Sequence, residues 1–386
     1  MREPVIAGVG MHRFGRWGDK TDHQMALESI YEALDDAGFA WNDVQAVACG
    51  RTMPGGGPGN LVWAMGGANG IPIVNVHNAC ATGGSALRLC CQWVSAGFHD
   101  VAVAVGMEKL PRHFIKAVTA EKDADYWRWT LTGTSNPGYW AMDCNRYMAE
   151  HGLTVDTLVR VAVKNKKHGA LNPKAWYQKE VTPEQVLASP MVADPLRQFM
   201  ICTPDEGAAV AVVTTREIAA AHSPHPPISV AASELATRVY GAPAADSIDL
   251  SYNPVGNAPP VTTVAAQRAY EAAGLGPEDL DVVELQDASA WNEIEYMEAL
   301  GLCGVGEAPA MVDSGATGLG GRLPINPSGG LLARGEPPGA SQLGQIYEMV
   351  QQLRGDAGPR QVEGAQVGLC HVYGGFGNAS VVILKR

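Results

Sequence analysis

The chain has 386 residues, 46% of them hydrophobic, and a formal net charge of −12 at pH 7. This length provides for one or two buried cores, and the negative charge argues against a nucleic-acid backbone or an anionic membrane as the main partner. The eight cysteines form no CxxC pair and no Cys/His cluster with zinc-site spacing, so we expect no metal site. No secretory signal and no apolar stretch of membrane-spanning length is present, which favours a cytoplasmic protein with free thiols.

Strand and helix patterns alternate along the chain in two similar runs. Residues 5–9 predict a first strand, and residues 32–47 predict a helix that ends at Gly38, a short loop and a second strand. Residues 269–283 repeat this layout with Gly274 at the helix end, and a glycine there suits the left-handed conformation that often closes a helix. Three further segments are apolar throughout, as in strands buried on both faces: 101–105, 208–213 and 367–369. The alternation predicts a layered α/β fold.

A cysteine follows an apolar segment early in the chain. Residues 71–76 predict a strand, Cys80 and two glycines come next, and residues 86–96 form an amphipathic run. The pattern predicts a strand, a sharp turn and a helix, which would place the thiol over the positive end of a helix, where the thiolate is favoured. Such a thiolate can take an acyl group from a thioester. The alternative is a small buried cysteine packed under a helix.

The alternation of strands and helices breaks down over about residues 110–197, which predicts an insert. The insert is rich in aromatic residues, namely Tyr126, Trp127, Trp129, Tyr139, Trp140, Tyr147 and Trp176. These side chains could build the insert's own core and a dimer contact. A proline-rich connector near residues 222–227 is the expected join between an N-terminal half, 1–222, and a C-terminal half, 223–386.

Several motifs along the chain occur in a characteristic order. They are VHNACATGGSAL (76–87), NPKA (172–175), MVADPLR (191–197), DEGAA (205–209), NE (292–293), INPSGG (325–330) and GGFG (374–377). In this order they resemble the thiolase superfamily, most closely the branch typified by the thiolase part of sterol carrier protein X. The resemblance covers nearly the whole chain. It implies a five-layer αβαβα thiolase fold with two buried inner helices, and an insert that covers the acyl pocket.

The resemblance assigns catalytic roles but also shows departures from the family pattern. Cys80 matches the acyl-accepting cysteine. Gln286 and Ala288 stand where the family has a histidine and a cysteine. Asn292 matches the asparagine that positions an oxyanion-hole water, although it could also be a helix N-cap, because residues 293–300 predict a helix.

Two further segments concern proton transfer. Glu336 stands in place of the family histidine that activates the cysteine; a carboxylate can accept that proton, and burial beside a thiolate would raise its pKa. The alternative is a degenerate site in which Glu336 caps a turn. His371 matches the second acid/base group of this branch, and Gly374 and Gly375 would offer backbone N–H groups to an oxyanion. The alternative for His371 is a buried, hydrogen-bonded histidine at a strand end.

The resemblance implies a thiolase-type acyltransferase that cleaves or forms the C–C bond of a β-ketoacyl-CoA through an acyl-enzyme, with coenzyme A as a substrate and no bound cofactor. The changed proton-handling residues and the aromatic insert favour a bulky, aromatic or polycyclic acyl group, with Trp127, Trp129 and Trp140 as substrate contacts. The alternatives are a thiolase-like retro-aldolase acting on a β-hydroxyacyl-CoA, and a non-catalytic scaffold that binds acyl-CoA.

Partners follow from the same resemblance. It implies a homodimer, and members of this branch often pair with a small zinc-ribbon/OB-fold subunit that holds acyl-CoA. One basic cluster in the insert, Lys164, Lys166, Lys167 and His168, either contacts an adenosine phosphate of CoA or forms a solvated helix face.

Overall fold

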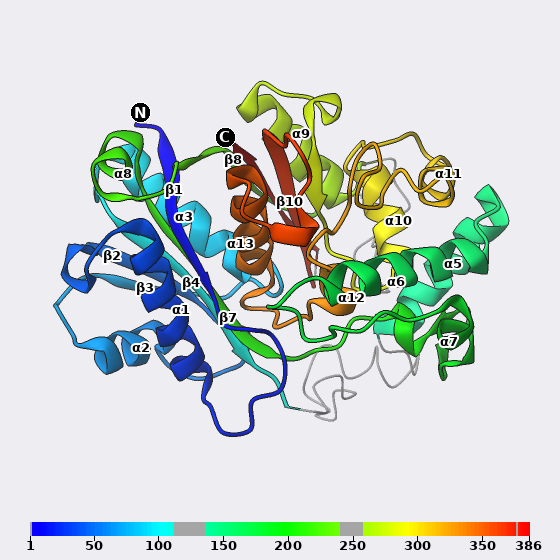
Figure 1. Ribbon diagram of the computed structural model, residues 1–386, viewed down its shortest axis with the longest axis horizontal. Coiled ribbons are helices and arrows are strands. Elements are labelled where there is room, and N and C mark those ends of the chain that lie inside the picture. The colour runs from blue at the N-terminus through cyan, green and yellow to red at the C-terminus, as the bar shows by residue number, and fades with distance from the viewer. Residues whose placement is uncertain (1, 112–135, 240–257, 376) are drawn as a thin grey trace.

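The computed structural model describes residues 2–111, 136–239, 258–375 and 377–386 (Figure 1). The described residues form a nine-stranded mixed sheet in the spatial order β3-β2-β4-β7-β1-β8-β11-β10-β9. Its strands are β1 (Pro4–Met11), β2 (Ala46–Gly50), β3 (Ile73–Val76), β4 (Ala102–Lys109), β7 (Glu206–Thr215), β8 (Ile228–Thr237), β9 (Val282–Glu284), β10 (Val367–Gly374) and β11 (Asn378–Lys385). A separate antiparallel pair joins β5 (Met191–Ala193) to β6 (Leu196–Arg197).

Helices cover and separate the parts of this sheet (Figure 1). The helices of the described residues are α1 (Asp22–Ala37), α2 (Pro58–Gly66), α3 (Thr82–Ala96), α5 (Asn136–His151), α6 (Val155–Ala170), α7 (Pro183–Ala188), α8 (Arg216–His222), α9 (Val261–Ala273), α10 (Ala290–Ala299), α11 (Ala308–Asp313), α12 (Gly330–Ala333) and α13 (Ser341–Arg354). Short 3-10 turns occupy Trp41–Asp43, Gln198–Met200, Pro277–Asp279 and Gly358–Arg360.

The two halves of the sheet have the same topology. The N-terminal strand order β3-β2-β4-β7-β1 corresponds to β9-β10-β11-β8, and a bridge between Ile325 and Val283 takes the place of β3. The halves meet where β1 and β8 pair antiparallel. The helix α1 ends at Gly38 (φ +72°) and its counterpart α9 ends at Gly274 (φ +64°), both left-handed. The predicted repeat and both glycine stops are confirmed.

Three apolar cores separate the layers of the fold. One core joins α1 and α2 to the outer face of the N-terminal strands, and another joins α9 and α10 to the outer face of the C-terminal strands. Between them, α3 and α13 fill the core that both halves share. A Cβ atom on Gly84 of α3 would lie 1.9 Å from Oε1 of Gln342, so only glycine permits this close approach of the two central helices. The predicted five-layer αβαβα arrangement with two buried inner helices is confirmed.

The insert packs on the C-terminal half. Its helix α6 contacts α10, α11 and α12, and the ring of Tyr147 lies 4.9 Å from that of Trp291. Buried insert residues such as Trp140 and Tyr147 therefore share the core of the C-terminal half, whereas the sequence favoured a core of the insert's own. Three of its aromatic residues, Tyr126, Trp127 and Trp129, lie outside the described residues.

Candidate active site

Cys80 lies in the turn between a strand and a central helix, as predicted. The strand β3 ends at Val76 and α3 begins at Thr82. The hydroxyl of Thr82 accepts a hydrogen bond from the backbone N–H of Asn78 at 2.8 Å, which closes the turn. Ala79 has a φ of +46°, a conformation that non-glycine residues adopt at a cost. The turn therefore holds the partly exposed thiol beside the N-terminus of α3, where the helix dipole favours a thiolate.

Glu336 lies on the loop that leads into the other central helix, α13. Its carboxyl group is buried, and Oε1 accepts a hydrogen bond from Nε2 of Gln286 at 3.2 Å. Oε2 accepts one from the thiol of Cys202 at 2.7 Å, and the side chain of Cys80 also hydrogen-bonds to this carboxyl group. Burial raises the pKa of Glu336, while the three hydrogen bonds oppose that rise. The structure thus brings Cys80, Glu336 and Gln286 together.

These side chains line a cavity of about 100 Å³. The lining residues are Cys80, Asn136, Trp140, Ile201, Cys202, Pro204, Gln286, Ala288, Tyr296, Glu336, Pro338, Tyr373 and Gly375. Trp140 and Gly375 are among the residues that the sequence predicts for substrate and oxyanion binding. Gly374 ends β10 beside Asn378 and does not line the cavity, and Trp127 and Trp129 lie outside the described residues.

Sequence reasoning missed several residues of this cavity. Cys202 carried a usable signal, because it lies three residues before the DEGAA motif, at the entrance of β7. Tyr373 could have been found from strand alternation, since it lies two positions after His371 on β10. Asn136 and Tyr296 follow no motif that the sequence analysis used.

His371 lies outside this cavity. It is fully buried on β10, its Nε2 lies 3.0 Å from the hydroxyl of Thr262, and its ring meets that of Tyr296 edge to face at 4.7 Å. Burial lowers its pKa to about 3, so the ring is neutral. The adjacent Cys370 joins the central core, so the two side chains point to opposite faces, as strand alternation predicts.

Asn292 also lies outside the lining residues. The helix α10 begins at Ala290, and its N-cap is Ser289, whose hydroxyl accepts from the backbone N–H of Asn292. The prediction that Asn292 caps this helix is therefore wrong, because the shorter serine side chain three residues earlier reaches that N–H. The amide of Asn292 is bonded to Ser289 at 2.7 Å and to Glu295 at 3.0 Å.

Comparisons with known proteins decide the family. Family models described as "Thiolase, N-terminal domain" and "Thiolase C-terminal domain-like" match residues 5–210 and 256–386. The chain belongs to the thiolase family. It is 36% identical to "Acetyl-CoA acetyltransferase" of Methanothermobacter thermautotrophicus, over 99% of each chain. It is 34% identical to "Benzoylsuccinyl-CoA thiolase subunit BbsB" of Thauera aromatica, over 97% of this chain and 95% of the relative.

More distant matches agree with this assignment. The thiolase is 33% identical to "Sterol carrier protein 2" of Rattus norvegicus, over 99% of this chain and 71% of the relative. A solved structure, "Ltp2-ChsH2(DUF35) aldolase", superposes with a TM-score of 0.85 at 26% identity, covering 99% of this chain and 98% of the other. The matches place the chain among thiolase-type acyl-CoA acyltransferases.

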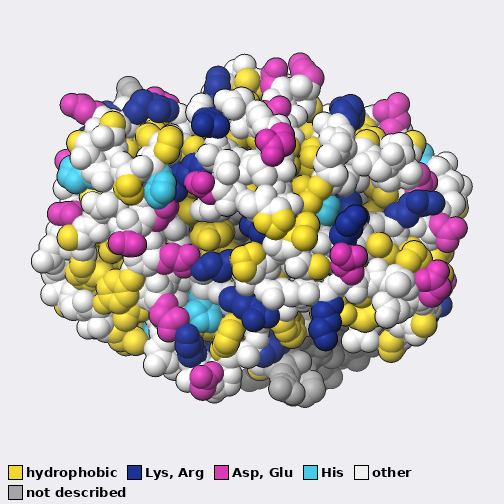
Figure 2. Space-filling view, viewed as in Figure 1, with side chains coloured by type: hydrophobic (Ala, Val, Ile, Leu, Met, Phe, Trp, Pro, Cys, Tyr) yellow, Lys and Arg dark blue, Asp and Glu magenta, His cyan; other side chains and the backbone are white. Residues whose placement is uncertain are grey.

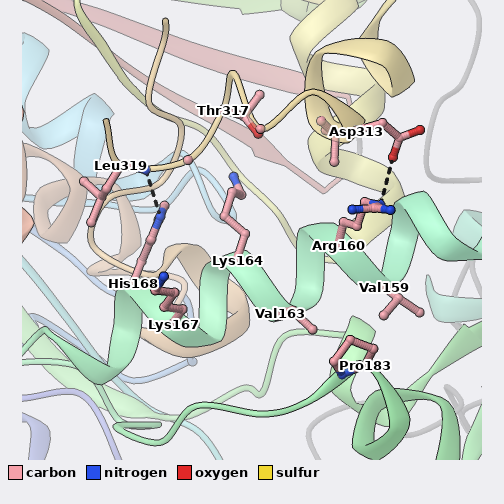
Figure 3. A pocket seen from close by; sticks show the side chains of 13 residues that line it. Val159, Arg160, Val163, Lys164, Lys167, His168, Pro183, Asp313, Thr317 and Leu319 are labelled. Carbon is pink, nitrogen blue, oxygen red and sulfur yellow. Dashed lines mark hydrogen bonds and ion pairs between the residues drawn. The ribbon is translucent and has the colours of Figure 1, made fainter. Parts of the chain in front are cut away.

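The basic cluster of this thiolase divides between two environments. Lys164 and Lys167 line a pocket of about 370 Å³ on α6, where Arg160 pairs with Asp313 at 3.4 Å (Figure 3). Lys166 is buried on the other side of the helix, where it donates to the carbonyl of Leu332 and burial lowers its pKa to about 8.

His168 lies at the end of the same pocket (Figure 3). Burial lowers its pKa to about 3, and its Nε2 accepts from the backbone N–H of Leu319 at 3.3 Å. Lys164 is bonded to Glu293 at 2.6 Å, so within the described residues only Lys167 of this cluster has no hydrogen-bond or ion-pair partner, and its side chain is exposed to solvent.

Two features are absent from the described part of the thiolase. No group of three or more His, Cys, Asp or Glu side chains there is placed to hold a metal ion. None of its helices combines the length and apolar character needed to cross a membrane. On the face seen in Figure 2, basic and acidic side chains are interspersed.

Proposed function

We propose that this thiolase cleaves or forms the C–C bond of a bulky, aromatic or polycyclic β-ketoacyl-CoA, through an acyl-enzyme on Cys80 and with coenzyme A as the second substrate. The observation that carries the proposal is the hydrogen bond between Cys80 and the buried carboxyl group of Glu336 at the N-terminus of α3. It pairs a nucleophile with a base in a small cavity.

Glu336 alone can carry out each proton transfer of the proposed reaction. In the cleavage direction, Glu336 takes the proton of the Cys80 thiol, and the thiolate attacks the β-keto carbon. The bond between the α- and β-carbons then breaks, and Glu336 returns the proton to the α-carbon of the departing acyl-CoA. The thiol of coenzyme A next gives its proton to Glu336 and attacks the acyl-enzyme, and Glu336 finally reprotonates Cys80.

The negative charge that develops on the carbonyl oxygen requires donors. Gly375, Tyr296 and Tyr373 line the cavity, and the backbone N–H of the glycine and the phenol groups of the tyrosines are the donors that we propose for this role. His371 and Asn292 keep their predicted roles only if a rearrangement on substrate binding brings them to the cavity, so the proposal does not depend on them.

The substrate class is proposed from two observations. Trp140 lines the cavity, and aromatic faces stack on flat ligands with about 0.5–1.5 kcal/mol each beyond area burial. The benzoylsuccinyl-CoA thiolase subunit, whose name refers to an aromatic acyl-CoA, covers nearly the whole chain. An aryl β-ketoacyl-CoA should therefore have a higher kcat/KM than acetoacetyl-CoA.

A retro-aldolase acting on a β-hydroxyacyl-CoA is the second candidate, because the aldolase structure superposes over the whole chain. A scaffold that only binds acyl-CoA is the third. Intact-mass spectrometry after exposure to a panel of acyl-CoAs distinguishes them. Acylation of wild-type protein that disappears in Cys80→Ala, together with lost turnover, supports the thiolase. Turnover of Cys80→Ala within a few-fold of wild type would favour the aldolase, and no turnover of any substrate would favour the scaffold.

We also propose a homodimer formed through β3. Among the residues that the structure describes, this strand pairs only with β2, and its other edge is open, with Val74 40% exposed. Leu61 and Met65 on the neighbouring α2 are also about half exposed, at 52% and 49%. A second copy would cover this edge, and Val74→Lys should reduce the dimer fraction in size-exclusion chromatography with light scattering.

Three further proposals concern the setting of the enzyme. The aldolase structure is named as a complex with a DUF35 subunit, which supports a small zinc-ribbon/OB-fold partner that holds acyl-CoA. All eight cysteines are free, which suits the reducing cytoplasm. The division into halves at residue 222 is supported by the matching strand orders on either side.

A further inference from the structure

Two thiols share one carboxyl group in the cavity. Cys80 reaches Glu336 from the N-terminus of α3, and Cys202 reaches it from the segment that leads into β7. A carboxylate that is flanked by two thiols could in principle take a proton from either. Which thiol ionises decides which one can act as the nucleophile.

The surroundings of Cys202 keep it protonated. It is buried beside two carboxyl groups, Glu336 and Asp287, and burial raises its pKa well above the usual range of a thiol. Cys80 is partly exposed and lies at the positive end of a helix. Cys202 is therefore a lasting hydrogen-bond donor, whereas Cys80 can ionise.

The carboxyl group of Glu336 depends on such donors. Arg334, which lies two residues before Glu336, is bonded to Glu284 at 3.0 Å, and no ion pair of the described residues includes Glu336. Several titratable and charged groups surround the pair, namely Cys80, Cys202, Asp205, Asp287, Arg334, Lys166 and the cavity residues Tyr296 and Tyr373. Asp205 is buried, and burial raises its pKa well above the usual range; a carboxyl group in either form does not help to ionise Glu336.

We propose that Cys202 is a positioning residue whose S–H donates to Oε2 of Glu336, keeping that carboxyl group ionised and oriented as the base for Cys80. The inference rests on the proposed function and adds a residue to its machinery. Removing the donor would leave one carboxylate oxygen buried without its partner. A hydrogen bond of ordinary strength corresponds to about one pH unit in the titration of Glu336.

The test follows the alkylation of Cys80 by iodoacetamide as a function of pH, with peptide mapping to separate Cys80 from the other thiols. The acid limb of this profile belongs to the coupled Cys80–Glu336 pair. In Cys202→Ala the midpoint of the limb should rise by about one pH unit. Cys202→Ser keeps a donor of similar size and should retain the wild-type midpoint. Cys202→Val, a second variant without a donor, should shift as the alanine variant does and guards against a folding defect in either one.

Different outcomes would overturn the role of Cys202 and the proposed function. An unchanged midpoint in both donor-free variants, or equal shifts in the serine and alanine variants, would overturn the role of Cys202. The profile needs no acyl-CoA, so this result can be obtained whatever the substrate is. Failure of wild-type Cys80 to become acylated by any acyl-CoA of the panel would instead remove the proposed function.

Discussion

The replacement Glu336→Gln tests the proposed base most directly. Glutamine keeps the shape of the side chain but cannot take the proton of Cys80. Of the three donors to Glu336, Gln286 and Cys202 bond to different carboxylate oxygens, and the single carbonyl oxygen of glutamine cannot keep both, so at least one hydrogen bond of about 1 kcal/mol is lost. Removing a buried carboxylate offsets part of this loss. We therefore expect the free energy of unfolding to change by less than about 2 kcal/mol.

The effect on acylation should be much larger than the effect on stability. Loss of a general base typically slows a reaction by about 10²-fold or more, which corresponds to about 2.7 kcal/mol of activation free energy. The assay is the time course of Cys80 acylation by intact mass, run beside thermal unfolding. Glu108→Gln is the matched control, because Glu108 is also a buried glutamate with a raised pKa but does not line the cavity. Acylation within a few-fold of wild type in Glu336→Gln would show that Glu336 is structural.

Three other replacements test separate parts of the structure. Neither carboxyl oxygen of Asp205 has a partner among the described residues, and burial raises its pKa well above the usual range. Above about pH 4 the unfolded chain ionises this side chain more readily than the folded protein does, so the free energy of unfolding of wild type falls as the pH rises. Asp205→Asn should therefore match wild type near pH 4 and be more stable by at least about 1 kcal/mol at pH 8 in thermal unfolding. Arg334→Met leaves the buried carboxyl group of Glu284 without its ion-pair partner, and burial already raises the pKa of Glu284 to about 7. Urea unfolding should therefore show a loss of about 3–5 kcal/mol in the free energy of unfolding at pH 8, and a smaller loss at pH 6, where Glu284 can take up a proton. Trp140→Ala should lower kcat/KM for an aryl β-ketoacyl-CoA about tenfold more than for acetoacetyl-CoA.

Each of these has an outcome that would contradict it. An equal gain for Asp205→Asn at both pH values would mean that the wild-type carboxyl group is ionised in the folded protein. A pH-independent loss in Arg334→Met would mean that Glu284 does not take up a proton. Equal losses for both substrates in Trp140→Ala would leave Trp140 with a packing role only.

The sequence predicted the parts of the fold that local patterns encode. The glycines at positions 38 and 274 end helices because they adopt left-handed conformations, and the same local rule holds in both halves. The turn at Cys80 was likewise predicted from a strand followed by small residues and a helix. These features depend on neighbours within a few positions, so a sequence is sufficient to recognise them.

Features that depend on distant packing could not be predicted in the same way. Cys202 approaches Glu336 only because the segment before β7 pairs with the loop before α13, 134 residues further along the chain. His371 matches a family motif, yet its orientation follows from the alternation of β10 and from the contact with Thr262 on α9. The start of α10 was misplaced by three residues because Ser289, and not Asn292, caps it.

The two central helices have equivalent places in the two halves, and each is preceded by a residue of the proposed catalytic pair. Cys80 precedes α3, and Glu336 precedes α13. The two similar halves thus form one asymmetric site in which corresponding positions have unlike chemistry, with the proposed nucleophile in one half and the proposed acid/base group in the other. Neither half contains a complete site. Fragments cut at the connector would consequently be inert when apart, and any activity would depend on complementation through the shared core of α3 and α13.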